Sequence, residues 1–503
     1  MTPSRPGSGL GTALDAACIL GLLACAAAIL ALTTGGYADA DDRYYLKAAD
    51  AWRTHAPAIG TLHWDMRLPL VLAMAAATAL GGRTELAAFI VPAVLCVLIL
   101  LLATYALVRP AAGRAAAVLA GLLAISAPVV AIYGRDFGPD ILEAALCAAS
   151  LALFVRGWRR PDPRATSAAW LGGAGLVLGV CFVDRATCVP LLGVYGLVFA
   201  HAMWNRHPGR WHMLALFSAF AVPLLAEAIY YTFMTGTPFY RWGIDARSLE
   251  IPSNHMIGQV AGGLRPPFSA ALMARWRPNS FIDVHWTVNP FIDMVTNPQH
   301  GWLILPGAAA GIALWRRTEP GSPLGWLVRV LCLWAALILI VVLVVLNLRP
   351  QPRYFLTLTW IAAALAALWL APFLRRPPVA LATAALLALN PAASRARPDP
   401  IAADRLIVQH MREEGGAVWS TDAHRDTLLL LDASLAPRLR PLPAPPGAPT
   451  FLTAPEAAQA PYQTWSVLWQ AAPTPPWPLG LVQRATGLRL PHGSTAMLVA
   501  APP

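Results

Sequence analysis

The feature that most constrains this chain is a series of apolar stretches, each close to the length that a helix needs to cross a bilayer. A spanning helix takes about 20 mainly apolar residues. Of the 503 residues, 57% are apolar and 13% charged, which excludes a soluble globular protein. We expect a mainly α, polytopic transmembrane helix bundle of about 11 spans. Apolar windows lie at residues 13–33, 86–108, 115–134, 140–156, 168–183, 186–204, 211–233, 301–315, 326–347, 354–373 and 378–390.

The net charge of +11 is spread over short loops, so it indicates membrane orientation and not nucleic-acid binding. A weaker apolar segment at 67–80 decides that orientation, because counting it as a span would reverse the side of every later loop. If it does not span, twelve short-loop arginines lie on one side and only four on the other. Cytoplasmic loops are the ones enriched in basic residues. We therefore predict that 67–80 is a juxtamembrane or re-entrant helix and that the amino terminus is cytoplasmic.

This orientation places three long segments outside: 34–85, 234–300 and the residues after about 392. The middle segment is rich in Trp, Tyr and Arg, which predicts a lid over a substrate entrance. We expect a transmembrane domain over 1–391 and a small extracytoplasmic α/β domain over 392–503. In that domain an apolar helical period precedes a Gly-Gly pair, after which a short buried strand is expected.

An acidic cluster directly follows the first span. Asp39, Asp41 and Asp42 lie within four residues and open a helical run that contains Tyr45 and Lys47, the only lysine in the chain. One interpretation is a helix start followed by an amphipathic interfacial helix. Three crowded aspartates exceed what a cap requires, however, and their mutual repulsion raises the affinity for a proton or a cation. The cluster is therefore a candidate for chemistry.

Two further charged points face the same side. Asp140 follows Pro139 at the start of the fourth span, close to Arg135, and this pattern is also that of an ordinary helix start. Arg353 and Tyr354 lie at the mouth of a later span. An arginine there could extend to bulk lipid phosphates or hold the phosphate of a bound lipid.

In this arrangement the chain resembles the GT-C superfamily of integral-membrane glycosyltransferases, in particular the bacterial branch related to protein O-mannosyltransferases and the lipid A aminoarabinose transferase. The family pattern of an acidic pair with a tyrosine four residues after its Asp fits Asp41, Asp42 and Tyr45. His63 to Pro69 match a basic residue and proline before the second juxtamembrane helix, and Asp140 matches an Asp that opens the fourth span. Arg353 with Tyr354 matches a late Arg-Tyr pair. The resemblance covers most of 10–375.

The resemblance implies a fold of the GT-C type and transfer of a sugar from a polyprenyl-phosphate donor to an acceptor on the periplasmic face of a bacterial inner membrane. Such chemistry needs a carboxylate base for the acceptor hydroxyl and cations for the departing phosphate. The implied catalytic residues are Asp41, Asp42 and Asp140. The implied substrate-binding residues are Tyr45, Lys47, His63, Arg67, Arg135, Arg353 and Tyr354.

Several alternatives stay open at the level of sequence. The aspartates could bind a divalent cation, and their spacing does not decide whether they do. A transporter or flippase of a lipid-linked glycan would place functional charges near the membrane midplane, where only Glu143 and Glu227 are candidates. A non-catalytic assembly protein would use the outer tail to bind partners. Neither the sugar nor the acceptor, whether glycolipid, glycan or protein, follows from the sequence.

Overall fold

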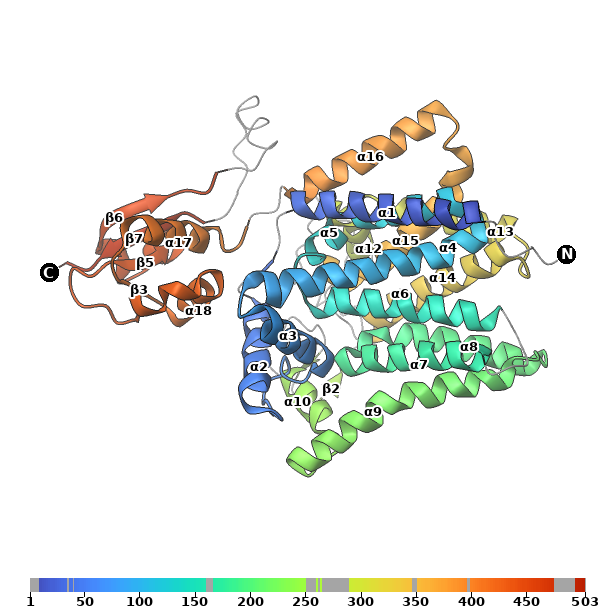
Figure 1. Ribbon diagram of the computed structural model, residues 1–503, viewed down its shortest axis with the longest axis horizontal. Coiled ribbons are helices and arrows are strands. Elements are labelled where there is room, and N and C mark those ends of the chain that lie inside the picture. Colours follow the sequence, from blue (N-terminus) through green and yellow to red (C-terminus); the bar gives the residue numbers. More distant parts are fainter. Residues whose placement is uncertain are drawn as a thin grey trace.

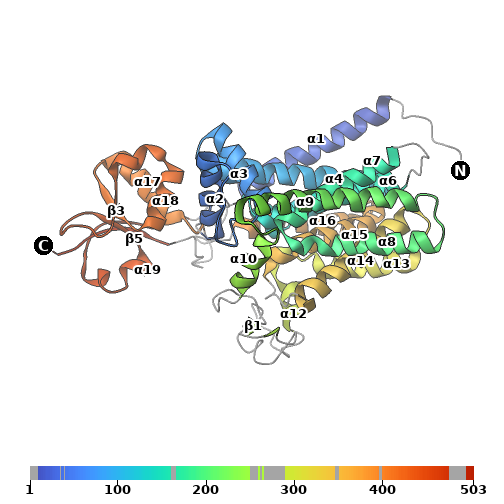
Figure 2. The ribbon, with the colours of Figure 1, turned by 90° about the horizontal axis from the view of Figure 1, so that it is seen from below.

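The computed structural model describes residues 9–33, 36–38, 40–159, 166–249, 259–260, 263–264, 289–345, 351–395, 399–474 and 494–502. These residues form a long bundle of helices and a smaller α/β domain that lies beyond one end of the bundle (Figures 1 and 2). The amino terminus lies at the opposite end.

Nine helical stretches in the described ranges are long and apolar enough to cross a membrane. A helix satisfies its own backbone hydrogen bonds, which is the condition for crossing lipid. The chain is therefore a multi-pass membrane protein, as the apolar windows predicted. The predicted window at 301–315 is an exception, because the helix there, Ile304–Arg317, has only 14 residues and is not among the nine. The helices are α1 (Gly9–Leu32), α4 (Val91–Ser126) with the preceding η1 (Leu86–Ile90), α6 (Pro139–Trp158), α7 (Thr166–Asp184), α8 (Val189–Trp204) with η2 (Ala186–Cys188), α9 (Met213–Thr235) with η3 (Arg210–His212), α14 (Pro323–Leu339) with η5 (Ile340–Val345), α15 (Leu356–Leu370) between η6 (Pro352–Phe355) and η7 (Ala371–Phe373), and α16 (Pro377–Arg395).

The stretch that contains α4 is a hairpin and not a single span. Its 41 residues are about twice what one crossing needs. Gly113 breaks it with φ of +87° and ψ of 178°, a conformation that glycine adopts without strain. The returning half packs back on the first, since Gly134 lies against Val97. The two predicted windows at 86–108 and 115–134 are thus separate crossings, and the second ends in α5 (Pro128–Tyr133).

Small residues let the spans approach closely. A Cβ atom on Gly175 would lie 2.0 Å from the carbonyl oxygen of Leu216, and one on Gly179 would lie 2.4 Å from that of Phe220. This four-residue spacing of glycines on α7 therefore brings its backbone into contact with α9, a packing mode common in membranes. Gly307 of α13 (Ile304–Arg317) approaches Ala362 of α15 in the same way.

Two amphipathic or short helices follow the first span and lie at the end of the bundle that faces the α/β domain (Figure 1). Helix α2 (Asp41–His55) begins with two aspartates, which complement the helix dipole, and buries Tyr45, Leu46 and Ala49. Helix α3 (Leu68–Gly81) has 14 residues, or about 21 Å, which is too short to cross the hydrocarbon core. It is therefore not among the nine candidate spans, and the orientation that depends on it stays a prediction.

The segment predicted as a lid, 234–300, is only partly among the described residues. It contains α10 (Tyr240–Leu249), the two-residue strands β1 (Gln259–Val260) and β2 (Gly263–Leu264), α12 (Asn289–Thr296) and η4 (Pro298–His300). The other residues of that segment lie outside the described ranges, so the lid stays a prediction.

The carboxy-terminal domain is α/β, as predicted, with a five-stranded sheet in the order β4-β3-β5-β7-β6. Strands β4, β3 and β5 are parallel, and β7 pairs antiparallel with both β5 and β6. The expected helix and strand on either side of the Gly-Gly pair are α17 and β3. The domain contains α17 (Ala402–Glu414), β3 (Val418–Ser420), α18 (Asp422–Leu431), η8 (Ala433–Arg438), β4 (Leu439–Pro441), β5 (Thr450–Thr453), α19 (Ala454–Ala457), η9 (Tyr462–Thr464), β6 (Ser466–Ala471) and β7 (Ala496–Ala500).

Candidate active site

The two aspartates at the start of α2 lie in different environments. Asp42 is buried and accepts a hydrogen bond from the backbone N–H of Ala38 at 2.7 Å. Burial raises the pKa of Asp42 to about 6, against the effect of the Ala38 hydrogen bond and with a contribution from the neighbouring Asp41. The Asp41 side chain is 37% exposed and its Oδ2 lies 3.2 Å from Nη1 of Arg353. Asp41 is therefore the aspartate of the pair that a substrate can reach.

Arg353 connects Asp41 to a cavity at the start of the span that contains α15. Its Nε donates to Oε1 of Gln351 at 3.0 Å, and its guanidinium lies 5.3 Å from the ring centroid of Tyr354. The adjacent cavity has a volume of about 270 Å³. It is lined by Tyr133, Gln299, Gln351, Pro352 and Arg353. Because the side chain of Arg353 is 32% exposed, its remaining donors can meet a ligand.

Asp140, in the first turn of α6, is buried and forms an ion pair with Arg185. Nη1 of Arg185 also lies 3.6 Å from Oε2 of Glu143, which accepts a hydrogen bond from Thr187 at 2.6 Å. The guanidinium of Arg185 lies 5.1 Å from the ring centroid of Tyr354. Tyr354 therefore contacts both Arg185 and Arg353, and this joins the Asp140 pair to the Asp41 pair in one cluster.

Two further charged residues, Asp184 and Arg67, belong to this cluster. Asp184 is buried at the end of α7, close to the backbone of Leu70. Nε and Nη1 of Arg67 have no hydrogen-bond partner among the described residues, and the Arg67 guanidinium lies 5.8 Å from the ring centroid of the buried Tyr45. Arg67 and Asp184 interact electrostatically without forming an ion pair within 4 Å. We call the whole set the charged cluster. It consists of Asp41, Asp42, Tyr45, Arg67, Asp140, Glu143, Asp184, Arg185, Arg353 and Tyr354.

Three predicted binding residues lie elsewhere. Lys47 forms an ion pair with Asp426 of α18 at 3.2 Å, and His63 lies 3.5 Å from Asp245 of α10. Arg135 donates to the carbonyl oxygens of Thr33 and Leu30 at 2.5 and 3.2 Å, and so caps the end of α1. The structure gives all three a partner outside the cluster.

Three members of the cluster were not among the predicted site residues: Glu143, Asp184 and Arg185. Arg185 carried a signal, because it is one of the few arginines in a short loop on the arginine-poor side. Asp184 carried another, because an acidic residue at the end of an apolar span requires a polar partner.

The partly exposed Arg353 can contact an anion, and the carboxylate of Asp41 beside it can accept a proton. Arginines bind phosphate through several directed hydrogen bonds, and a carboxylate beside them can act as a base. In the part of the chain that the structure describes, no three His, Cys, Asp or Glu side chains gather closely enough to hold a metal ion. No set of metal ligands can therefore be named among the described residues.

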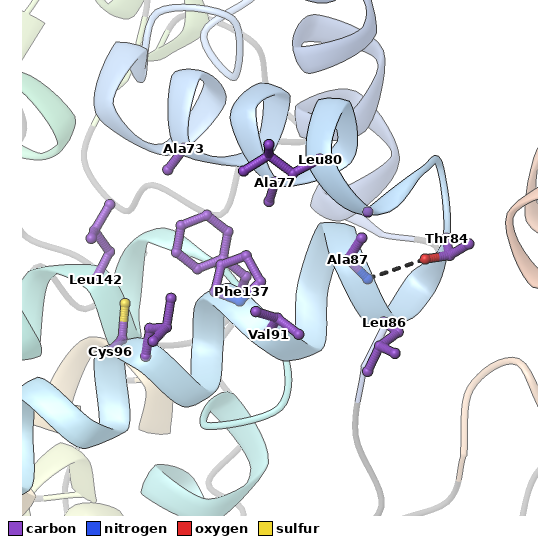
Figure 3. Close-up of a pocket in the computed structure, with 13 residues that line it drawn as sticks. Ala73, Ala77, Leu80, Thr84, Leu86, Ala87, Val91, Cys96, Phe137 and Leu142 are labelled. Atoms are coloured by element: carbon purple, nitrogen blue, oxygen red, sulfur yellow. Dashed lines mark hydrogen bonds between the residues drawn. The ribbon is translucent and has the colours of Figure 1, made fainter.

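An apolar groove is a second cavity of the molecule (Figure 3). It has a volume of about 570 Å³ and lies between α3, the start of α4 and the start of α6. Leu142 and Phe137, two and three residues from Asp140 in the chain, belong to its wall. The groove is lined by Ala73, Ala77, Leu80, Gly81, Thr84, Leu86, Ala87, Val91, Pro92, Leu95, Cys96, Phe137 and Leu142.

In sequence, residues 68–226 match the family of dolichyl-phosphate-mannose-protein mannosyltransferases. None of the curated proteins matches the chain significantly.

The fold is similar to that of solved membrane proteins. The structure of ArnT from Cupriavidus metallidurans bound to undecaprenyl phosphate matches with a TM-score of 0.55 at 15% identity, over 98% of each chain. The Archaeoglobus fulgidus oligosaccharyltransferase in complex with Zn and sulfate matches with a TM-score of 0.52 at 15% identity, over 84% of this chain and 62% of that one. The archaeal oligosaccharyltransferase AglB in complex with an inhibitory peptide and a dolichol-phosphate matches with a TM-score of 0.51 at 12% identity, over 84% and 64%.

The chain thus spans less than two thirds of the archaeal oligosaccharyltransferases that it matches. These similarities confirm the resemblance to GT-C membrane glycosyltransferases and show that the chain has the GT-C fold.

Proposed function

We propose that this protein, whose fold is GT-C, is a glycosyltransferase that moves a sugar from a polyprenyl-phosphate donor to an acceptor at the periplasmic face of a bacterial inner membrane. The mannosyltransferase family match supports sugar transfer. The undecaprenyl phosphate and dolichol-phosphate bound to two structurally similar proteins support a lipid-phosphate donor. The arginine-poor end of the bundle, which carries the cluster, is the end that the positive-inside rule places outside.

The observation that carries the proposal is the contact between Asp41 and Arg353, 3.2 Å apart at the edge of the cavity beside α15. It brings together a partly exposed carboxylate and a guanidinium from segments 312 residues apart in the chain. A base for the acceptor and a cation for the phosphate are the two groups that this transfer requires.

In this mechanism Asp41 takes the proton from the acceptor hydroxyl as its oxygen attacks the anomeric carbon of the sugar. The bond between that carbon and the phosphate oxygen breaks, and the polyprenyl phosphate leaves with the electron pair. Arg353 and Arg185 stabilise the negative charge on the leaving phosphate. The proton stays on Asp41 until solvent removes it, and the phosphate leaves without a general acid. Asp140 orients Arg185.

The apolar groove supports the lipid part of the donor. Its wall is almost entirely hydrocarbon, and it includes Phe137 and Leu142, which lie three residues before and two residues after Asp140 in the chain. We infer that the polyprenyl chain occupies this groove with its phosphate toward the cluster. Burial of the polyprenyl chain in the groove contributes binding free energy in proportion to the apolar area covered.

The transport alternative has less support. It needs charged residues at the membrane midplane. Glu143 lies beside Arg185 in the cluster, and Glu227 lies 3.3 Å from Arg241 of α10, which also donates to the carbonyl oxygen of Phe182. Both carboxylates are thus paired near the outer end of the bundle.

The test starts from a deletion strain that is left without the gene or is given the gene for the wild type or for Asp41→Asn. Envelope glycolipids and glycoproteins from the three strains are compared by mass spectrometry. We expect the deletion to remove one sugar from an envelope component, and only the wild type to restore it at equal protein level. Glu413→Gln, which removes an exposed acid from α17, is the matched control and should restore the product fully. Restoration by Asp41→Asn, or no change in the deletion strain, would overturn the proposal.

A further inference from the structure

The short connection between α1 and α2, which leads directly to Asp41 and Asp42, is held in place by side chains from three other segments. The carbonyl oxygen of Thr33, where α1 ends, accepts a hydrogen bond from Arg135 at 2.5 Å. The backbone N–H of Tyr37 donates to Oε1 of Glu85 at 3.2 Å, and that of Ala38 donates to Asp42 at 2.7 Å. The position of the two aspartates therefore depends on these bonds.

The side chain of Glu85 lies directly against Gly36. Gly36 has φ of +119°, and a Cβ atom there would lie 2.3 Å from Oε1 of Glu85, so only glycine permits this approach. The next residue, Tyr37, is 2% exposed and its ring lies 5.3 Å from that of Phe89, in the helical turn that follows Glu85. The connection is thus packed on Glu85 and η1.

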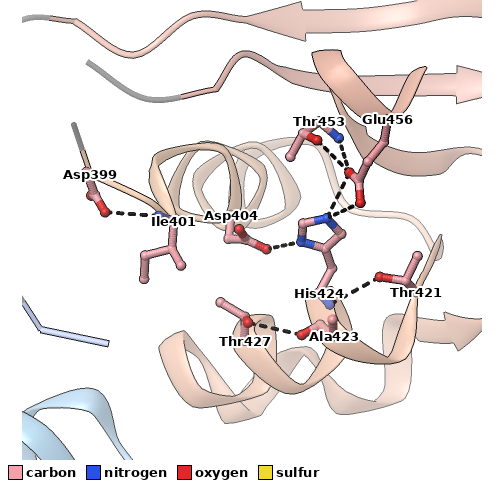
Figure 4. A network of polar contacts seen from close by, with 9 residues as sticks. All are labelled: Asp399, Ile401, Asp404, Thr421, Ala423, His424, Thr427, Thr453 and Glu456. Carbon is pink, nitrogen blue, oxygen red and sulfur yellow. Dashed lines mark hydrogen bonds and ion pairs between the residues drawn. The ribbon is translucent and has the colours of Figure 1, made fainter. Parts of the chain in front are cut away.

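The carboxylate of Glu85 is in turn held by the carboxy-terminal domain. Arg405 of α17 donates to both oxygens of Glu85, through Nη1 at 2.9 Å and Nη2 at 2.6 Å. Its Nε donates to Asp399 at 3.0 Å, which fixes the orientation of the guanidinium. Asp399 also accepts from the backbone N–H of Ile401 at the start of α17 (Figure 4). A two-pronged bond of this kind is directional as well as strong.

We propose that Arg405 is a positioning residue of the transfer reaction: through Glu85 it fixes the connection that sets Asp41 against Arg353. The inference rests on the proposed function, because it assigns the carboxy-terminal domain a role in that site. The contact sequence runs from Asp399 to Arg405, Glu85, the backbone of Tyr37 and Ala38, and then to the start of α2. The domain thereby contributes to the site without touching the substrate.

A second ion pair between the same two parts of the molecule offers a matched control. Lys47 of α2 lies 3.2 Å from Asp426 of α18, but the Lys47 side chain is 56% exposed, and such a pair contributes little. Asp426→Asn therefore removes a contact between the domain and α2 without affecting Glu85 or the connection.

The test uses the full chain in detergent and two readouts. The first is hydrogen exchange of the amides of Tyr37 and Ala38, which does not require any activity. We expect Arg405→Gln to speed their exchange about tenfold, Arg405→Lys to restore part of the protection, and Asp426→Asn to have no effect. Unchanged exchange in Arg405→Gln would overturn the proposal whatever the reaction is.

The second readout is the transfer rate. Arg405→Gln and Glu85→Gln should each lower kcat about tenfold with little change in KM for the donor, and the double variant should lose no more than either single variant, because both break the same contact. If the losses of the two single variants multiply in the double variant, the proposal is contradicted. Exchange across α17 and α18 at the wild-type rate shows that the domain itself stays folded. If the proposed function is wrong, the wild-type protein transfers no sugar, but the exchange rates of Tyr37 and Ala38 still respond to Arg405→Gln. The two failures can therefore be distinguished.

Discussion

Two networks of charged side chains within the described residues differ in how completely their hydrogen bonds are satisfied. In the carboxy-terminal domain, Nδ1 of His424 bonds to Asp404 at 2.7 Å and Nε2 bonds to Glu456 at 3.0 Å (Figure 4). Glu456 also accepts from the backbone N–H and the hydroxyl of Thr453. Both ring nitrogens thus have a carboxylate partner.

The charged cluster differs from this network. It too contains buried carboxylates and cations, but two nitrogens of Arg67 have no hydrogen-bond partner within the described ranges. Asp184 lies near Arg67 and the backbone of Leu70 without an ion pair within 4 Å. A buried polar group without a partner costs stability. We therefore expect the His424 network to stabilise the domain, and we propose that the incompletely paired charges of the cluster meet a substrate.

The largest effect is expected from Arg185, which holds Asp140 and Glu143 together. Its side chain is 11% exposed and that of Asp140 is 4% exposed, so Arg185→Gln leaves two buried carboxylates without their cation. We expect a loss of about 3–5 kcal/mol in the free energy of unfolding and a fall in transfer rate of about 100- to 1000-fold. Thermal unfolding in detergent and the rate measure the two effects, and Arg185→Lys should recover part of each. Wild-type behaviour of Arg185→Gln would show that the cluster is neither structural nor functional.

A smaller loss is expected from His424→Gln, because it leaves Asp404 buried with one partner fewer. Burial lowers the pKa of His424, but the bonds to Asp404 and Glu456 raise it to about 10 from 6.5. A raised histidine pKa gives stability that is complete below pH 6.5 and is lost as the pH rises through 10. We therefore expect His424→Gln to destabilise the domain by about 3 kcal/mol at pH 6 and by less at pH 9.

Hydrogen exchange of α17 and α18 at the two pH values measures this difference. The transmembrane helices, which do not touch His424, provide the internal control. An effect of equal size at both pH values would show that the charge of His424 is not what stabilises the domain.

The smallest change in the free energy of unfolding is expected from Asp42→Asn, and this change is a gain in stability. Burial raises the pKa of Asp42 from 3.8 to about 6, so ionisation of Asp42 costs the folded state stability as the pH rises through that range. Asn keeps an acceptor for Ala38 without the charge. We expect the variant to be more stable than wild type by about 2–3 kcal/mol at pH 8 and equally stable at pH 4. Thermal unfolding of both proteins at the two pH values tests this, and a variant less stable at pH 8 would contradict it.

Much of the fold could be predicted from the sequence because membrane spans depend on local composition. The apolar windows identified the nine candidate spans within the described ranges, but the window at 301–315 corresponds to α13, which is shorter than these. A helical period before Gly415 and Gly416 identified α17 and β3. The glycine at 113 is the turn between two windows that the structure joins in one helical stretch.

The site was predicted less completely, because its contacts are long-range. Asp41, Asp140 and Arg353 do lie in one cluster, but the partner of Lys47 is Asp426, and the partners of Arg135 are backbone carbonyls of α1. Neither partner leaves a local sequence signal. Arg185 was recognisable only because it is a basic residue in a loop on the arginine-poor side, where the orientation of the spans does not require one.

The charged cluster is proposed to bind a lipid-linked phosphate. The direct measurement is the affinity of the full-length protein for undecaprenyl phosphate, determined by native mass spectrometry for wild type, Arg353→Gln and Arg412→Gln. Arg412 is a matched arginine in the carboxy-terminal domain, 60% exposed and paired with Asp432. We predict that Arg353→Gln weakens binding at least about tenfold, because it removes a charge-assisted contact to phosphate, and that Arg412→Gln binds as wild type. Equal affinity of Arg353→Gln and wild type would contradict the account.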